Sequence, residues 1–251
     1  MGKLIVIEGT DGSGKSTQFR CLTERLAREG VTFQKLVFPR YDQESSALIW
    51  MYLHGEFGTK PEDVNAYAAS TFYAVDRFAS YQQVWKEFYQ NGGLILSDRY
   101  TTSNAVHQAS KEPADRREAF FSWLYDLEFE KMGMPKPDLV IYLDVPIAFT
   151  EQLMRQREAA TGTHADIHEQ DLDYLRTCRM TAAEAADYYG WTRIACVQSL
   201  QVFQLPQAAA MAYRAVLPQV SCPCRALRPS YRLMRPPKGF DRHRKEYKFP
   251  L

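Results

Sequence analysis

The chain has 251 residues, of which 45% are hydrophobic and 24% are charged, and its formal net charge is +1. A chain of this size can bury one large core, so we expect a single α/β domain rather than two small ones. No apolar run approaches the roughly 20 residues that cross a bilayer, and no signal-peptide pattern precedes the first strand, which predicts a soluble, cytoplasmic protein without a membrane partner.

The first apolar run, residues 4–7, is followed at once by a complete phosphate-binding loop. Its glycines let the backbone curl so that several N–H groups face one anion, and the dipole of the following helix adds to this attraction. In this pattern Lys15 supplies a mobile charge for the outer phosphates, and the Ser16 hydroxyl is a ligand for Mg²⁺. A glycine-rich hairpin that matches by chance is the alternative, and the strand–loop–helix setting argues against it. The predicted nucleotide-binding residues are Gly9, Thr10, Asp11, Gly12, Ser13, Gly14, Lys15, Ser16 and Thr17.

Short apolar runs alternate with longer helical patterns along the chain. The runs are residues 4–7, 33–38, 94–97, 139–143 and 193–197. This alternation predicts a P-loop α/β fold with a five-stranded parallel sheet and helices on both faces. In such sheets ligands bind at the carboxyl ends of the strands, so the residues directly after each run are the candidates for chemistry.

Charged residues follow the second and third runs. Arg40 stands in a turn with Phe38 and Pro39, and the proline restricts the backbone that aims its guanidinium, a planar group suited to phosphate. Asp98 and Arg99 follow the third run, where an acid can hold Mg²⁺ and an arginine can reach a phosphate. An ordinary surface ion pair at the end of a strand is the alternative for these two residues.

A long helical pattern covers residues 62–89 and places Tyr73 and Arg77 four residues apart on one face. An aromatic ring can stack on a base, and an arginine can donate to a base carbonyl. Core packing with a surface charge explains the same two residues when they are taken alone.

A polar segment, residues 158–169, comes after Arg155 and Arg157 and has the composition of a mobile flap. Phosphoryl transfer needs cations over the migrating group and exclusion of water, and a flap with arginines brings both when substrate is bound. A solvated loop without a role explains these residues equally well.

The end of the chain is basic. Residues 222–251 hold nine of the 31 Lys and Arg residues but two of the 30 Asp and Glu residues, together with several prolines. We therefore predict a domain over residues 1–220 and a poorly ordered, Pro-rich tail over residues 221–251. A solvated tail without a specific partner is favoured over a tail that binds nucleic acid.

Taken together, these motifs resemble the thymidylate kinase family from residue 1 to about residue 200. The resemblance implies transfer of the ATP γ-phosphate to dTMP, with Mg²⁺, by a P-loop kinase fold that has a mobile lid and is usually a homodimer. The motifs that carry it are residues 8–17, residues 38–41, Tyr73 with Arg77, residues 98–100 with Ser103 and Asn104, and residues 143–146.

The resemblance also implies roles around the phosphates. Lys15 and Ser16 hold the ATP phosphates and Mg²⁺. Arg40, with Phe38 beside it, and Arg99 match residues that bind the acceptor phosphate.

For the base and the sugar, the resemblance implies three contacts. Tyr73 takes the place of a base-stacking phenylalanine, and Arg77 and Asn104 match residues that read the thymine edge. His107 and His168 stand where many relatives have aromatic residues beside the sugar.

Two lineages of the family differ in where the catalytic arginine lies, in the phosphate-binding loop or in the lid. Asp11 matches a residue near the metal and the acceptor phosphate, and it is followed by Gly12 rather than by an arginine. The chain thus resembles the type that relies on lid arginines, here Arg155 and Arg157.

Two other functions stay open at this point. A deoxynucleoside kinase shares the loop but phosphorylates a 5′-hydroxyl, and it needs a carboxylate after the second strand, where this chain has Arg40. A non-catalytic nucleotide-binding regulator that binds nucleic acid through its basic tail is the alternative from another class. The set of arginines argues against it, because a sensor has no use for lid cations.

Overall fold

The computed structural model describes residues 1–147, 149–150, 154, 168, 172–198, 201–202 and 205–219. The chain divides into two units, Met1–Val220 and Ser221–Leu251. The second unit, which is the predicted tail, lies outside the described residues, as do Arg155 and Arg157 of the predicted lid.

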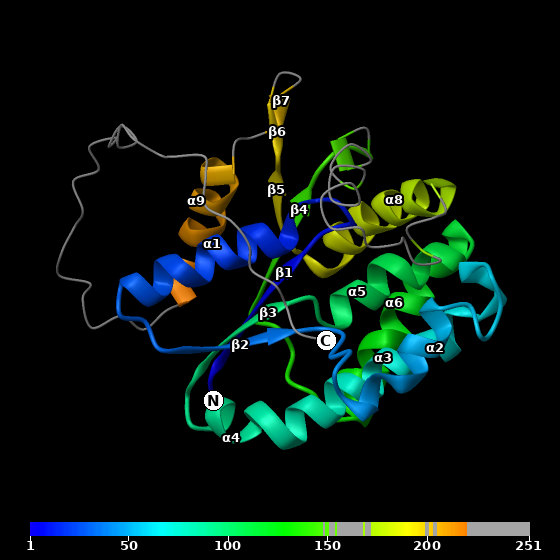
Figure 1. Cartoon of the computed structure of the whole chain (residues 1–251), viewed down its shortest axis with the longest axis horizontal. Coiled ribbons are helices and arrows are strands. Elements are labelled where there is room, and N and C mark those ends of the chain that lie inside the picture. The colour runs from blue at the N-terminus through cyan, green and yellow to red at the C-terminus, as the bar shows by residue number, and fades with distance from the viewer. Residues whose placement is uncertain are drawn as a thin grey trace, which may run out of the picture. The chain divides into compact units, whose positions relative to one another are not determined.

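Five strands form one parallel sheet in the order β2-β3-β1-β4-β5 (Figure 1). They are β1 (Lys3–Glu8), β2 (Phe33–Val37), β3 (Leu94–Asp98), β4 (Leu139–Asp144) and β5 (Thr192–Ala195). In the register, Ile5 of β1 lies opposite Leu96 of β3 and Leu139 of β4. The predicted five-stranded parallel sheet is confirmed.

The last strand ends earlier than the apolar run suggests. β5 stops at Ala195, and Val197 instead begins a short antiparallel hairpin of β6 (Val197–Gln198) and β7 (Gln201–Val202). The apolar run therefore spans two elements, because apolar residues continue through the turn that separates them.

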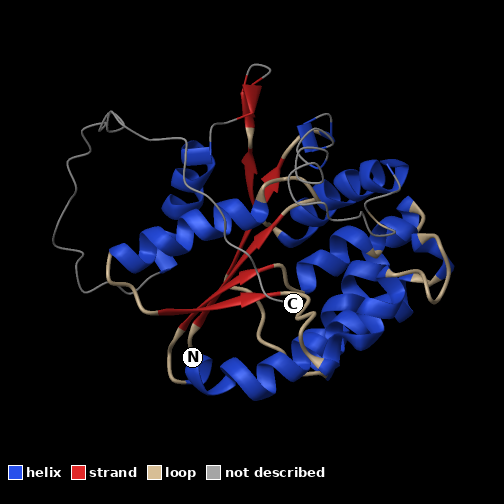
Figure 2. Ribbon diagram, viewed as in Figure 1, coloured by secondary structure: helices blue, strands red, loops and turns tan. Residues whose placement is uncertain are grey.

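Helices cover both faces of the sheet (Figure 2). α1 (Lys15–Arg28) and α9 (Leu205–Val216) pack on the face to which Ile5 and Ile7 point. The other face, which includes Leu4 and Val6, is covered by α5 (Thr101–His107), α6 (Arg117–Tyr125) and α8 (Leu172–Tyr189). Because successive side chains of a strand point to opposite faces, the apolar β1 contributes to both cores.

The predicted helix over residues 62–89 is made of several elements. α3 (Ala66–Ser80) begins after Asn65, whose side chain caps the helix by accepting a hydrogen bond from the Ala68 N–H at 2.8 Å. A π-helical turn, Tyr81–Trp85, then leads into α4 (Lys86–Gln90). The cap explains why the helix begins at Ala66 rather than at Glu62.

A shorter helix, α2 (Ala47–Leu53), precedes α3 in the chain. None of the helices in the described part of the chain is both long and apolar enough to cross a membrane. Parallel pairing places the carboxyl ends of β1, β2 and β3 at one edge of the sheet, so the segments that follow them are neighbours.

Candidate active site

The loop between β1 and α1 has the geometry of an anion site. Gly12 and Gly14 have φ angles of 73° and 78°, in the left-handed region that residues with a Cβ atom rarely adopt. No side chain in the described part of the chain caps the N-terminus of α1. The hydroxyl groups of Thr10 and Ser13 are buried and have no hydrogen-bond partner among the described residues. Backbone and hydroxyl donors are therefore available to bind phosphate oxygens.

Lys15 lies buried against this loop. Its ammonium group donates to the Thr10 carbonyl at 3.0 Å, and it lies 3.7 Å from Oδ1 of Asp11. Burial lowers the pKa of Lys15, and the positive charge of Arg99 acts in the same direction, against the carboxylates of Asp11 and others. A second anionic partner such as a phosphate relieves this cost, because it stabilises the charged form.

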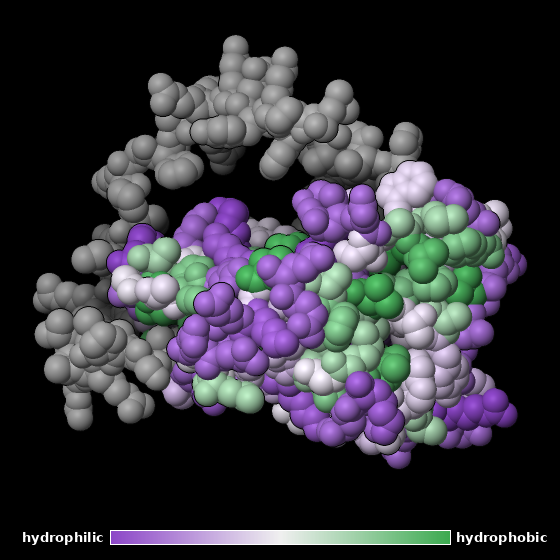
Figure 3. All heavy atoms as spheres, turned by 90° about the horizontal axis from the view of Figure 1, so that it is seen from below, coloured by the Kyte–Doolittle hydropathy of each residue, from purple (hydrophilic) through white to green (hydrophobic). Residues whose placement is uncertain are grey.

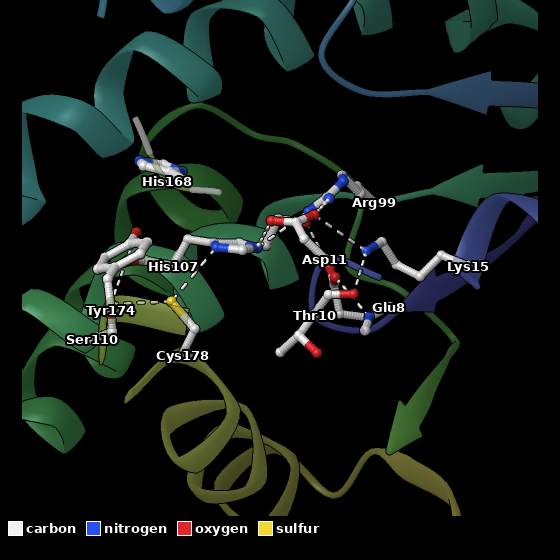
Figure 4. A network of polar contacts seen from close by, with 12 residues as sticks. Glu8, Thr10, Asp11, Lys15, Arg99, His107, Ser110, His168, Tyr174 and Cys178 are labelled. Atoms are coloured by element: carbon white, nitrogen blue, oxygen red, sulfur yellow. Dashed lines mark hydrogen bonds and ion pairs between the residues drawn. The ribbon is translucent and has the colours of Figure 1, made fainter. Parts of the chain in front are cut away.

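Arg99 connects the phosphate-binding loop with the end of β3 (Figure 4). Its Nη2 donates to Oδ1 of Asp11, and its Nη1 lies 3.2 Å from Nε2 of His107. Arg99 has a φ of 69°, a left-handed conformation found at no other non-glycine residue that the structure describes. Ser97 supports it through a hydrogen bond from its hydroxyl to the Arg99 carbonyl at 2.6 Å. A backbone conformation of this kind is costly and tends to persist where it places a functional side chain.

Asp11 is ionised in this setting. Burial raises the pKa of the carboxyl group, but the charges of Arg99 and Lys15 outweigh that effect and hold the pKa well below its usual range. Asp11 therefore carries a negative charge between two cations.

A cavity of about 280 Å³ lies beside this junction. The structure brings most of the predicted acceptor-site residues together around it. The predicted residues that line it are Asp11, Phe38, Tyr73, Arg77, Arg99, Asn104 and His107. The lining also includes Gln108 and His168, of which His168 belongs to the predicted lid segment.

Arg40 does not line this cavity. Its Nε donates to Oδ1 of Asp76 at 3.1 Å, and its Nη2 donates to the Ser45 hydroxyl at 2.9 Å. Asp76, which is buried, also accepts from the Arg40 backbone N–H at 2.9 Å. The role of Asp76 escaped the sequence analysis, although it directly precedes Arg77 in the motif.

Arg77 is fixed by a buried carboxylate that no sequence pattern indicated. Its Nε and Nη2 donate to Glu128 at 2.7 and 2.5 Å, and Glu128 also accepts from the Thr101 hydroxyl at 2.7 Å. Glu128 lies in a π-helical turn, Asp126–Lys131, where its charged neighbours resemble an exposed surface. The bidentate pair holds one edge of the guanidinium, while Arg77 contributes to the cavity wall.

Asn104 is held in a similar way. Its Nδ2 donates to the Ser70 carbonyl at 3.1 Å, and the side chain is buried at the cavity wall. With the NH₂ group directed at Ser70, Oδ1 is the atom suited to accept from a ring N–H.

Oxygen atoms suited to Mg²⁺ lie next to the loop. Asp98 is buried, and its Oδ1 has no hydrogen-bond partner in the described part of the chain. Ser16 is exposed near the start of α1. No group of three or more His, Cys, Asp or Glu side chains that could hold a metal ion occurs among the described residues. This oxygen donor set fits Mg²⁺, which binds through few protein ligands together with phosphates.

His168 lies over the cavity on the side of His107. Their imidazole rings are stacked, with centroids 5.8 Å apart. Nε2 of His168 lies 2.9 Å from the Tyr52 hydroxyl, and Lys111 donates to the same hydroxyl at 2.7 Å. Burial lowers the pKa of His168, and the nearby His107 and Lys111 act in the same direction. The imidazole is therefore neutral.

Comparison with known proteins gives one consistent result. A family model described as thymidylate kinase matches residues 7–204. The thymidylate kinase of Mycobacterium tuberculosis (strain H37Rv) is 32% identical over 190 residues, which cover 75% of this chain and 87% of that protein. The thymidylate kinase of Homo sapiens is 32% identical over 147 residues, 59% of this chain and 63% of that protein. That of Synechococcus sp. (strain CC9311) is 30% identical over 163 residues, 63% of this chain and 73% of that protein.

Proposed function

The chain belongs to the thymidylate kinase family and phosphorylates dTMP to dTDP with ATP as the donor, and we propose that the P-loop and the cavity beside it carry out this transfer. The observation that supports this assignment is the position of Asp11. It belongs to the loop that follows β1, it lines the cavity, and it is paired with Arg99. The donor and acceptor phosphates would therefore meet at the Asp11–Arg99 pair.

On the donor side, the residues of the loop bind the ATP phosphates. The open N-terminus of α1 and the hydroxyls of Thr10 and Ser13 supply donors, and Lys15 supplies a positive charge for the migrating phosphoryl group. The lid arginines Arg155 and Arg157 add charge at the same place when the lid covers the site. This part of the proposal concerns residues outside the described part of the chain.

On the acceptor side, the cavity binds dTMP. Tyr73 faces the base, and Arg77, aligned by Glu128, donates to a base carbonyl. Asn104 accepts from the adjacent ring N–H. Arg99 binds the acceptor phosphate, while Phe38 and His107 complete the walls, the latter beside the sugar.

The arrangement catalyses transfer by positioning and charge neutralisation. The acceptor is already an anionic phosphate, so no side-chain general base is required. Arg40 remains a candidate ligand of the acceptor phosphate. To bind it, the Arg40 guanidinium must either break its ion pair with Asp76 or contact the phosphate through Nη1, since Nε and Nη2 donate to Asp76 and Ser45.

Ser16 and Asp98 are the residues that would hold Mg²⁺. Mg²⁺ held there would supply positive charge that offsets the negative charge of the ATP phosphates during transfer. The unpartnered Oδ1 of Asp98 and the exposed position of Ser16 support this assignment.

We also propose that the protein is a cytoplasmic homodimer, as the family resemblance implies. Large apolar side chains are exposed on α2 (Leu48, Trp50) and along one stripe of α3 (Tyr67, Val75, Phe78). Figure 3 shows apolar side chains gathered toward one end of the face that it presents. An exposed apolar stripe of this kind is typical of a protein–protein contact.

Equilibrium binding tests the assignment of the two sides. We expect Arg99→Ala to weaken dTMP binding by roughly tenfold or more, the effect of a lost charge-assisted contact, while ATP binding stays within about twofold. Lys15→Ala should show the opposite pattern. An Arg99→Ala variant that binds dTMP as well as the wild type would contradict the proposed acceptor site.

A further inference from the structure

His107 belongs to a closed cycle of hydrogen bonds that the transfer reaction does not by itself require. Its Nδ1 lies 3.6 Å from Sγ of Cys178, and the Cys178 thiol donates to the Ser110 hydroxyl at 3.4 Å. The Ser110 hydroxyl in turn donates to the His107 carbonyl at 2.7 Å. Figure 4 shows these residues on the side of His107 that faces away from Asp11.

The directions of these bonds determine which imidazole nitrogen carries the proton. Arg99 has donors only, so Nε2 of His107 accepts from its Nη1 and is unprotonated. The proton of a neutral imidazole then lies on Nδ1, which faces Cys178 Sγ. The thiol uses its hydrogen toward Ser110, so its sulfur is free to accept. Every donor in the cycle thus meets an acceptor.

The electrostatic environment agrees with this protonation state. Burial lowers the pKa of His107 to about 3, and Arg99, Lys15 and Lys111 act in the same direction against Asp11. Burial also raises the pKa of the Cys178 thiol to about 12, so the thiol keeps its proton. At neutral pH the imidazole is uncharged and the thiol can donate.

A neutral acceptor has a specific advantage at this position. Arg99 already shares its charge with Asp11, and a second carboxylate in place of His107 would weaken its attraction for an incoming phosphate. An aromatic hydrocarbon ring would remove the acceptor of one N–H group of Arg99, whose side chain is partly buried. Neutral His107 satisfies that N–H group and leaves the positive charge of the guanidinium in place.

We propose that His107 is a positioning residue: held as the Nδ1–H tautomer by Cys178 and Ser110, it fixes the Arg99 guanidinium toward the acceptor phosphate. The proposal rests on the role of Arg99 in dTMP binding given above. Neither Cys178 nor Ser110 lines the cavity, and the cycle of hydrogen bonds connects both of them to His107, which does.

Nitrogen NMR of the full chain tests the tautomer directly, without turnover. In the wild type we expect the ¹⁵N spectrum of His107 to show a protonated Nδ1 and an unprotonated Nε2 at neutral pH. Cys178→Ala removes the acceptor and should produce a mixture of tautomers. Cys196→Ala is the matched control, because Cys196 is also a buried cysteine, and its thiol donates to the Ile194 carbonyl in the core on the other face of the sheet. A wild-type Nε2–H tautomer, or an imidazolium, would overturn the proposal.

A double-mutant cycle on the dissociation constant of dTMP tests the coupling to Arg99. When Arg99 is present, His107→Phe should weaken dTMP binding about tenfold. A loss of this size is expected for one charge-assisted hydrogen bond. In an Arg99→Ala background the same change should have a much smaller effect, because only the wall contact of His107 beside the sugar is then altered. His107→Gln, which keeps an acceptor, should recover most of the loss. An equal loss in both backgrounds would mean that His107 acts on dTMP directly, and the positioning role would be refuted.

The two experiments separate this proposal from the proposed function. If wild-type protein does not bind dTMP but shows the Nδ1–H tautomer, the assignment of the acceptor site is wrong and the positioning role falls with it. If it binds dTMP and shows the other tautomer, the acceptor site stands and the role of His107 alone is rejected.

Discussion

Arg77 and Glu128 form a bidentate ion pair in the interior of the protein, although 51 residues separate them in the sequence. Both side chains are almost completely buried. A buried pair of this kind holds its partners in one orientation, and removal of one partner leaves an uncompensated charge. The pair thus fixes the guanidinium that is proposed to read the base.

Arg77→Ala should raise the KM for dTMP and leave the KM for ATP nearly unchanged, because the lost donor faces the base and not the P-loop. The substitution also strands Glu128, at a cost of about 3–5 kcal/mol in unfolding free energy. The double variant Arg77→Ala/Glu128→Gln should recover much of that stability without recovering the KM. Steady-state kinetics with urea denaturation separate the two effects, and a double variant with a normal KM would exclude Arg77 from base recognition.

Lys15→Ala should lower kcat by roughly 10²-fold or more and leave the fold intact, since the ammonium group neutralises the migrating phosphoryl group. Arg20, which lies exposed on the same helix, provides a control: Arg20→Ala should retain full activity. The measurement is kcat at saturating ATP and dTMP, with circular dichroism to check folding. A folded Lys15→Ala protein with nearly normal kcat would show that another group carries this charge.

Arg155→Ala and Arg157→Ala should each lower kcat more than they raise KM, because a lid cation meets charge chiefly in the transition state. If the two side chains share one developing charge, their effects in the double variant will be less than the product of the single effects. Wild-type kcat in all three variants would place the catalytic cation elsewhere.

Acid should destabilise the folded state through the buried histidines. His107 has a folded pKa of about 3 against 6.5 for an ordinary histidine, so between these values the unfolded chain binds a proton that the folded chain does not. The free energy of unfolding therefore falls as the pH falls toward this window and through it, by about 2 kcal/mol between pH 7 and pH 5 for this residue. The carboxyl of Asp11, whose pKa is lowered in the folded state, is ionised in both states above pH 5 and contributes little there.

Urea denaturation near pH 7 and near pH 5 measures this effect. His107→Phe should lose about 2 kcal/mol less stability than the wild type over the same interval. Equal losses in the two proteins would show that His107 is charged in the folded state or exposed to solvent.

The residues that the sequence could predict lie at the ends of strands or within one helix. The P-loop, Asp98 with Arg99, and the Tyr73–Arg77 pair depend on local geometry, because a strand end or a helical spacing of four residues places them without reference to distant segments. The parallel sheet followed from the same local patterns, whereas the order of its strands was not predicted and comes from the structure.

The partners of those residues depend on how the helices pack, and this the sequence could not supply. Glu128 reaches Arg77 from a π-helical turn, and Cys178 reaches His107 from a helix 71 residues further along the chain. Arg40 shows the same limit. Its place after β2 was predicted, but the direction of its guanidinium is set by Asp76 on α3. The hydrogen bonds that orient the site come from these long-range contacts.

The central claim is that the cavity selects a thymine nucleotide that already carries a phosphate. A coupled assay of ADP release with dTMP, dUMP, dGMP, dAMP and thymidine as acceptors tests it directly. We expect dTMP to be the best acceptor, dUMP a weaker one and the purine monophosphates poor, since each stranded donor or acceptor costs about 1–3 kcal/mol. A purine monophosphate as the best acceptor would refute the roles of Tyr73, Arg77 and Asn104 together, and faster turnover of thymidine than of dTMP would contradict a phosphate-binding acceptor site.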